Sequence, residues 1–232
     1  MKKESAAAAL VFFLLTALPA FSADKVVLKT QKDKVSYAIG CNIGNDFKQK
    51  SIDINPNALL QGITDALAGS PKSLTDKEMA EAMMALRQEL QTRQRESAGK
   101  AAARNKKEGA DFLAKNRLKE GVKVTPSGLQ YRVITDGKGD TPKPSDTVTV
   151  HYRGTLIDGT EFDSSYKRNE PSTFPLSGVI PGWTEGLQLM RPGGTYELYL
   201  PSNLAYGERG AGETIGPEAV LIFTVKLISI NK

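Results

Sequence analysis

The sequence is poor in the residues that most often carry out chemistry directly. It has one cysteine, Cys41, and one histidine, His151, among 232 residues. A single cysteine excludes an intramolecular disulfide, so noncovalent packing must hold the fold. A single histidine excludes a metal centre built from several histidines. The sequence also contains no paired nucleophile and base and no phosphate-binding loop. We therefore expect neither a cofactor nor a covalent mechanism.

Charge of either sign is also not in large excess. The formal net charge is +5, with 31 Lys and Arg against 26 Asp and Glu. The first 22 residues contribute Lys2, Lys3 and Glu4, which leaves the rest of the chain near +4. A nucleic-acid-binding surface usually concentrates basic residues and interleaves aromatic ones. Here the basic residues are dispersed among acidic ones, so we expect no nucleic-acid partner.

The N-terminus has the pattern of a secretory signal peptide, predicted over residues 1–22. Two lysines precede an apolar run from residue 6 to 18, and Ala20 and Ser22 are small residues at the expected cleavage site. Cleavage is predicted after Ser22, with cleavage after Ala23 as the alternative. The junction has no cysteine, which disfavours a lipoprotein. A retained membrane anchor is the other interpretation, which the short run disfavours. The sequence therefore predicts an exported protein.

Residues 23–90 predict a small helical domain. Helical spacing over 32–50 places on one face Val35, Ala38, Ile39, Ile43 and Phe47. Asn55-Pro56 begins a second helix, which Gly69 ends. A third begins with a capping box at 75–78. Cys41 is expected to be half-buried in the first helix; an intermolecular disulfide is the alternative.

So few helices bury too little surface to form a core without assistance. Their apolar faces are therefore expected to meet a second copy, and Met79 and Met83 suit an irregular interface. We predict a homodimer formed through residues 32–90. Packing of these helices on the C-terminal part of the chain is the alternative.

Residues 91–118 predict a connecting helix. Residues 91–111 are almost wholly polar apart from alanine, a composition that favours helix without an apolar stripe. A helix that continues from Asp76 to about Asn116 would be about 60 Å long. Gly99 and Gly109 weaken that prediction, and a frayed linker is the alternative.

Residues 119–232 predict a mainly antiparallel sheet with one short helix. Alternation with a period of two begins near Gly128, recurs from Thr147 to Tyr152, and returns in two later segments, 196–200 and 221–227. Asp158-Gly159 predicts a hairpin. Apolar spacing after Pro181 changes to that of a helix. The expected fold class is α+β.

Several ordered motifs in this region resemble one known family. They are Val150-His151-Tyr152, Phe162-Asp163, Val179-Ile180-Pro181-Gly182-Trp183 and Ala205-Tyr206-Gly207. From Gly128 to the C-terminus the sequence resembles the FKBP-type peptidyl-prolyl cis-trans isomerases. With the signal and the helices included, it is similar to the Mip/FkpA-like members of that family. The resemblance implies an isomerase with chaperone activity, a homodimer, and a location in the periplasm or at the outer membrane or cell surface. It also implies proline-containing unfolded polypeptides as substrates and macrolides of the rapamycin type as inhibitors.

The resemblance also implies a site. Asp163 and Tyr206 would be catalytic, with the Tyr206 hydroxyl and the Ile180 amide binding substrate carbonyls. Trp183 would lie beneath the proline ring, Arg168 would pair with Asp163, and Ile215 would cover the rim. The remaining residues of the implied pocket are Tyr152, Phe162, Val179 and Phe223.

The sequence departs from the family pattern at the rim of this site. Ser172 replaces an aromatic residue, Gly178 replaces an acidic one, and loop 211–216 is small and polar. These departures bear on inhibitor affinity and sequence preference. A chaperone or adhesin that keeps the fold but only binds unfolded chains is the competing interpretation; a structural protein is a more distant one. The complete set of pocket residues favours the enzyme.

Overall fold

The computed structural model describes residues 26–231, so the predicted signal peptide lies outside the described residues. The chain divides into two compact units, one ending at Thr75 and one beginning at Asp76. We call them the N-terminal and C-terminal units and describe each by itself. Within the described range no helix is long and apolar enough to cross a membrane, and no group of acidic, histidine or cysteine side chains is placed to hold a metal ion.

The N-terminal unit contains two helices, α1 (Gln31–Gln49) and α2 (Pro56–Ala68). Thr30 and Asp33 form a capping box at the start of α1, and the Asn55 side chain accepts two backbone N–H bonds at the start of α2. Gly69 ends α2 in the left-handed conformation, as its position in the sequence predicts. Neither helix has a buried residue. Cys41 is exposed in this single chain, so its predicted half-buried position is wrong for the chain by itself.

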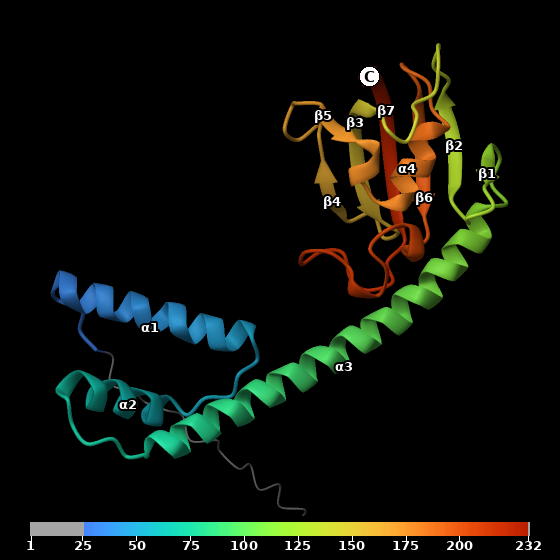
Figure 1. The fold of residues 1–232 in the computed structure, drawn as a ribbon. Helices are drawn as coiled ribbons and strands as arrows, with labels where there is room; N and C mark the ends of the chain where they lie inside the picture. Colours follow the sequence, from blue (N-terminus) through green and yellow to red (C-terminus); the bar gives the residue numbers. More distant parts are fainter. Residues whose placement is uncertain (1–25, 232) are drawn as a thin grey trace, which may run out of the picture. The chain divides into compact units, whose positions relative to one another are not determined.

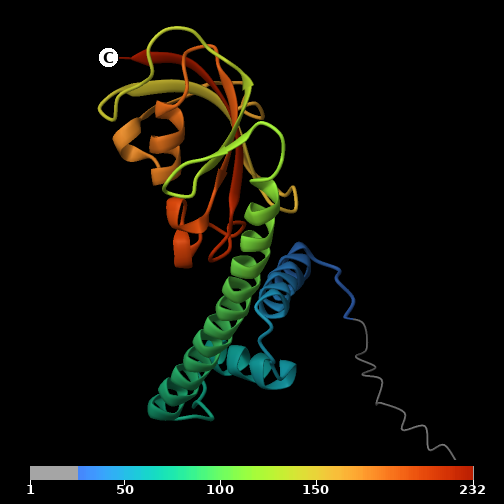
Figure 2. The same ribbon diagram turned by 90° about the vertical axis from the view of Figure 1, so that its right-hand side faces the viewer.

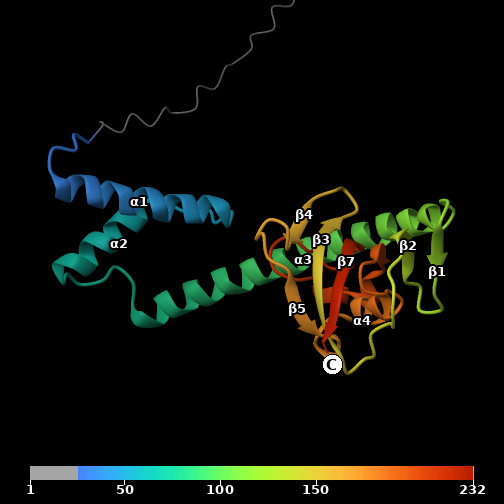
Figure 3. The same ribbon diagram turned by 90° about the horizontal axis from the view of Figure 1, so that it is seen from above.

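The C-terminal unit begins with α3, which runs without interruption over Asp76–Asn116 (Figure 3). The continuous helix is confirmed, and the frayed linker is wrong. The predicted change of domain at residue 90 falls inside α3, whereas the two units divide before its first residue.

An antiparallel sheet follows α3 (Figure 1). The main path through it is β1-β2-β6-β7-β3-β4. The long strand β3 pairs with β7 on one side, and on the other side it pairs first with β5 and then with β4. The strands are β1 (Val122–Val124), β2 (Gln130–Thr135), β3 (Thr147–Leu156), β4 (Glu161–Ser164), β5 (Ser172–Pro175), β6 (Thr195–Leu200) and β7 (Leu221–Asn231).

One short helix, α4 (Pro181–Gln188), packs on one face of the sheet (Figures 1 and 2). Leu198 of β6 lies against Gly186 of α4, and Leu187 is fully buried. Phe112 of α3 contacts Tyr199, which points to the opposite face because side chains alternate along a strand. The sheet is thus covered by α4 on one face and touched by the end of α3 on the other. Three short 3₁₀ helices complete the unit, η1 (Leu176–Gly178), η2 (Ser202–Leu204) and η3 (Gly207–Arg209).

The α+β class, the four helices and the Asp158-Gly159 hairpin are confirmed. The sequence did not predict β1, which is only three residues long, or β5, which ends in a proline. Short segments of this kind carry too little alternation to be recognised. Strand β5 matters because it brings Phe174 toward the pocket described next.

Candidate active site

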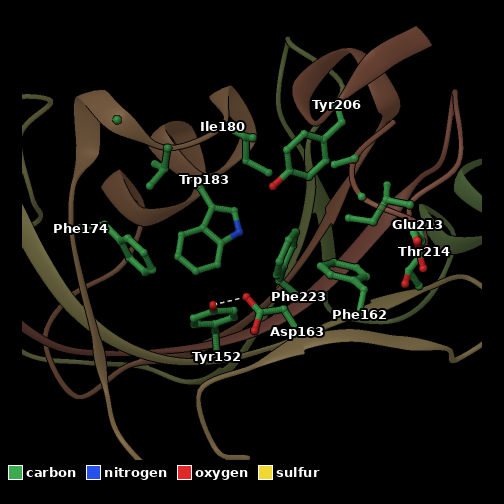
Figure 4. A pocket seen from close by; sticks show the side chains of 15 residues that line it. Tyr152, Phe162, Asp163, Phe174, Ile180, Trp183, Tyr206, Glu213, Thr214 and Phe223 are labelled. Atoms are coloured by element: carbon green, nitrogen blue, oxygen red, sulfur yellow. Dashed lines mark hydrogen bonds between the residues drawn. The ribbon is translucent and has the colours of Figure 1, made fainter. Parts of the chain in front are cut away.

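A cavity of about 560 Å³ opens between α4, β3, β4, β7 and the segment that joins β6 to β7 (Figure 4). Its wall is mainly apolar, with few polar atoms. The lining residues are Tyr152, Phe162, Asp163, Phe174, Gly178, Val179, Ile180, Trp183, Tyr206, Ala211, Gly212, Glu213, Thr214, Ile215 and Phe223.

Trp183 forms the floor of the cavity (Figure 4). It follows Pro181 in the first turn of α4, where a proline needs no hydrogen-bond partner. Three aromatic rings meet it edge to face, with centroids 5.1 Å away for Tyr152, 5.2 Å for Phe223 and 5.8 Å for Phe174. This geometry is the favourable one for aromatic pairs. These contacts hold the Trp183 ring in one orientation and leave it only 4% exposed.

The two phenylalanine walls depend on a glycine in β3. A Cβ at Gly154 would lie 2.6 Å from the Phe162 ring and 2.9 Å from the Phe223 ring. The two rings meet edge to face at 5.5 Å directly over this glycine. Any larger residue at position 154 would displace both rings toward the cavity.

Asp163 is held at the edge of the cavity by two partners. The Tyr152 hydroxyl donates to its Oδ2, and Arg168 Nη1 donates to its Oδ1 over 2.6 Å. Arg168 also donates to the Tyr152 hydroxyl over 3.1 Å and to Ser172 Oγ over 3.2 Å. Ser172 thus serves as an acceptor for Arg168. The three groups form a closed, charge-assisted network.

This network keeps Asp163 ionised. Burial alone would raise the pKa of Asp163, but the hydrogen bonds from Tyr152 and Arg168 outweigh burial and hold that pKa below its ordinary value. Burial, followed by the hydrogen bond to Asp163, raises the pKa of Tyr152. The hydrogen bonds to Tyr152 and Asp163 raise the pKa of Arg168. All three groups therefore keep a single protonation state around neutral pH.

Other polar groups that line the cavity have no protein partner among the described residues, and they include the buried indole N–H of Trp183. The Tyr206 side chain is 41% exposed and points its hydroxyl into the cavity (Figure 4). Neither this hydroxyl nor the Ile180 backbone N–H makes a hydrogen bond to another residue in the 26–231 range. A donor N–H and a donor hydroxyl remain free for a ligand's carbonyl groups.

The structure brings together almost all of the site residues that the sequence predicts. Arg168 is the one that does not line the cavity; it acts behind Asp163, as expected of its partner. Phe174 is the lining residue that sequence reasoning missed. Gly178 and residues 211–214, which also line the cavity, were expected at its rim only as departures from the family pattern. Phe174 lies on the short strand β5, which carried no clear signal. The others lie in irregular segments, where position cannot be inferred from periodicity.

Comparison with known proteins gives a consistent result. Residues 32–133 match the family described as "Domain amino terminal to FKBP-type peptidyl-prolyl isomerase", and residues 138–228 match "FKBP-type peptidyl-prolyl cis-trans isomerase". "Outer membrane protein MIP" of Legionella longbeachae is 48% identical over 209 residues, which cover 90% of both chains. FkpA of Escherichia coli K12 is 40% identical, over 97% of this chain and 85% of its own. The crystal structure of FkpA from Escherichia coli superposes with a TM-score of 0.69 at 39% identity, covering 88% of this chain and 99% of that one.

Proposed function

Because the chain belongs to the FKBP-type peptidyl-prolyl cis-trans isomerases, we propose that the aromatic cavity is where it rotates the amide bond before proline. The observation that carries this proposal is the combination of an apolar floor with unpartnered donors, among them the Ile180 N–H and the Tyr206 hydroxyl. Such a site can bind a proline ring by shape and its flanking carbonyls by hydrogen bonds.

The mechanism follows from the physics of the amide bond. Resonance makes rotation cost about 18–20 kcal/mol, and the planar amide is more dipolar than the twisted one. Over Trp183, in the aromatic cavity, the planar form loses more solvation on binding than the twisted form does. The site therefore binds the twisted state more tightly than the ground state, which accelerates rotation without a covalent step.

Asp163 contributes in two ways. Its ionised carboxylate fixes the Tyr152 ring, and therefore one wall of the cavity, through the hydroxyl bond. Its charge also acts on the carbonyl carbon of the amide, which carries a partial positive charge. Arg168 keeps the carboxylate oriented from behind. Val179 and Phe162 complete the apolar boundary, and Ile215 covers the rim from the segment between β6 and β7.

We propose that the N-terminal unit and the first turns of α3 join two copies of the chain. Apolar side chains stand exposed on the helices of the N-terminal unit, including Ile39 at 54%, Leu60 at 63% and Leu67 at 85%. A groove of about 500 Å³ between α1 and α2 is lined by Ile43, Phe47 and their apolar neighbours. Exposed apolar surface of this extent indicates a binding partner. A homodimer through residues 32–90 would cover it and would place two isomerase sites in one molecule.

We further propose that the protein is exported and accelerates the proline-limited folding of other exported proteins, with chaperone activity of its own. The basic and apolar N-terminal pattern supports export, and the name of the Legionella longbeachae relative refers to the outer membrane. The location would then be the periplasm or the outer membrane or cell surface. Two sites on one dimer would raise the avidity for an unfolded chain without any new contact.

The test is a refolding assay with a proline-limited protein. The mature chain should increase the rate of the slow, proline-limited phase, and a macrolide of the rapamycin type should abolish that increase by occupying the cavity. A protein that only held unfolded chains would suppress aggregation but leave the slow phase unchanged. That result would favour the binding-module interpretation and would remove the site assignment.

A further inference from the structure

The rim of the cavity is formed by residues 210–217, which we call the rim loop. Five of its residues line the cavity, and Ala211 and Ile215 exchange two backbone hydrogen bonds of 2.8 and 3.1 Å. This bridge closes residues 211–215 into a small turn. The turn is therefore expected to move as one body, and its position decides how wide the rim of the cavity is.

The inner end of the rim loop is tied to the segment that carries Tyr206. The Glu218 backbone N–H donates to the Gly207 carbonyl over 2.8 Å, and the Ser202 hydroxyl donates to the Glu218 side chain. These bonds fix the residue that follows the loop. They do not restrain its outer side.

On its outer side the rim loop meets α3 (Figure 1). The Asn105 side-chain N–H donates to the Pro217 carbonyl over 2.8 Å, across a sequence separation of 112 residues. The same nitrogen lies within 3.1 Å of where a Cβ on Gly216 would be. One turn further along α3, Gly109 lies against the buried Val220 side chain.

The rest of this boundary is open. A groove of about 340 Å³ separates α3 from the turn, with Ala101, Arg104 and Glu108 on the helix side and Glu213 and Thr214 on the loop side. Glu213 and Thr214 line the cavity as well, so the tip of the turn has space on both sides. The base of the turn packs on the hydrophobic core through the buried Ile215 and the half-buried Ala211. The tip is thus the part whose position depends on few contacts, and the Asn105 bond to Pro217 is the hydrogen bond that links α3 to the rim loop.

We propose that Asn105 is a positioning residue for isomerisation. By holding Pro217, it sets how far the turn stands over the cavity, and so sets the affinity for the polypeptide segments that flank the proline. A short substrate that occupies only the floor over Trp183 does not sense the turn. A longer substrate passes beneath it and does. This proposal rests on the assignment of the cavity as the active site.

The test uses the full-length protein with Asn105→Asp, which keeps the side-chain shape but places an acceptor opposite the Pro217 carbonyl. Gln94→Glu is the matched control: it makes the same amide-to-carboxylate change on an exposed position of the same helix. Both are assayed with a blocked Xaa-Pro-Phe peptide and with the same core extended by four residues at each end. A hydrogen bond contributes about 0.5–1.5 kcal/mol, which corresponds to about a two- to tenfold change.

We expect Asn105→Asp to raise KM for the extended peptide about two- to tenfold, with kcat unchanged, and to leave both constants for the short peptide unchanged. The amide resonances of Gly212 and Ile215 should shift in Asn105→Asp and not in Gln94→Glu. Equal losses for both peptides, together with a lower melting temperature, would show a structural role and overturn the proposal. Parental constants for both peptides would also overturn it.

The parental protein and Tyr206→Phe separate this proposal from the assignment of the site. If Tyr206→Phe isomerises both peptides at the parental rate, the cavity assignment itself has failed. If Tyr206→Phe is impaired with both peptides while Asn105→Asp behaves like the parental protein, the cavity assignment stands and only the role of Asn105 is refuted.

Discussion

Replacing Gly109 by alanine adds a methyl group where α3 lies against the rest of the C-terminal unit. A Cβ at this position would lie 2.7 Å from the Val220 Cγ2 and 3.7 Å from its Cβ. Val220 is only 6% exposed and has a short, branched side chain, so it cannot simply move aside. Gly99, ten residues earlier in the same helix, has no atom within 4 Å of an added Cβ. The two positions therefore differ in contact while sharing a helical backbone.

The expected magnitudes follow from two opposing effects. Alanine is favoured over glycine inside a helix by about 0.8–1.0 kcal/mol at either position. Overpacking at Gly109 costs about 1–3 kcal/mol. Gly99→Ala should therefore leave the stability unchanged or raise it by up to about 1 kcal/mol, whereas Gly109→Ala should lower it. The difference between the two variants isolates the contact with Val220, because the helix preference cancels.

Thermal unfolding followed by fluorescence measures this difference, since Trp183 is the only tryptophan and lies in the C-terminal unit. About 1 kcal/mol shifts the midpoint of a unit of this size by about 2–4 °C. The two variants should therefore melt several degrees apart, with Gly109→Ala the lower. If both variants are stabilised equally, α3 does not pack against Val220. That result would refute the contact between this helix and the part of the chain that carries the site.

Three further predictions concern the site and the assembly. Tyr206→Phe should lower kcat/KM about two- to tenfold and leave the melting temperature within about 1 °C, because its hydroxyl has no protein partner to lose. The control is Tyr166→Phe, which changes an exposed tyrosine outside the cavity. Equal rates for the two variants would contradict the role of Tyr206. The folded pKa of Asp163 lies below the value of about 3.9 for a free aspartate. The stabilisation that its ionisation contributes is therefore complete above that pH and is lost as the pH falls through the folded pKa. Because the same carboxylate acts in the site, kcat/KM should be flat from about pH 5 to 8 and fall below pH 4. Asp163→Asn should have lower kcat/KM throughout and no acid limb, and a parental profile for this variant would rule out a catalytic carboxylate. The double variant Met79→Glu, Met83→Glu should convert the proposed dimer to monomers, because unpaired charges are costly in an apolar interface. Sedimentation of the mature chain measures the oligomeric state. A parental protein that is monomeric at micromolar concentration would refute the dimer.

The cavity was largely predictable because its residues lie within compact motifs on regular elements. Phe162 and Asp163 follow a two-residue hairpin signal, and Trp183 follows a proline that begins a helix, so sequence position determines where each side chain points. Strand alternation also placed Tyr152 on the same face as Val148 and Val150, which are fully buried in the core. The way in which Arg168 divides its hydrogen bonds among Asp163, Tyr152 and Ser172 was not predictable, because it depends on a loop without periodicity.

The docking of α3 was missed for a different reason. The residues that face the rest of the C-terminal unit recur at helical spacing, but they are small residues, amides and one phenylalanine: Ala101, Asn105, Gly109, Phe112 and Asn116. A search for an apolar stripe does not detect them, so this part of the helix is expected to be exposed on all sides. Packing here depends on close approach at Gly109 and on hydrogen bonds from Asn105 and from the fully buried Asn116. Gly109, which in the sequence weakens the prediction of a continuous helix, is the residue that allows that helix to lie against Val220. The same feature that lowers helix propensity therefore brings α3 close enough to the rim of the cavity for Asn105 to reach Pro217.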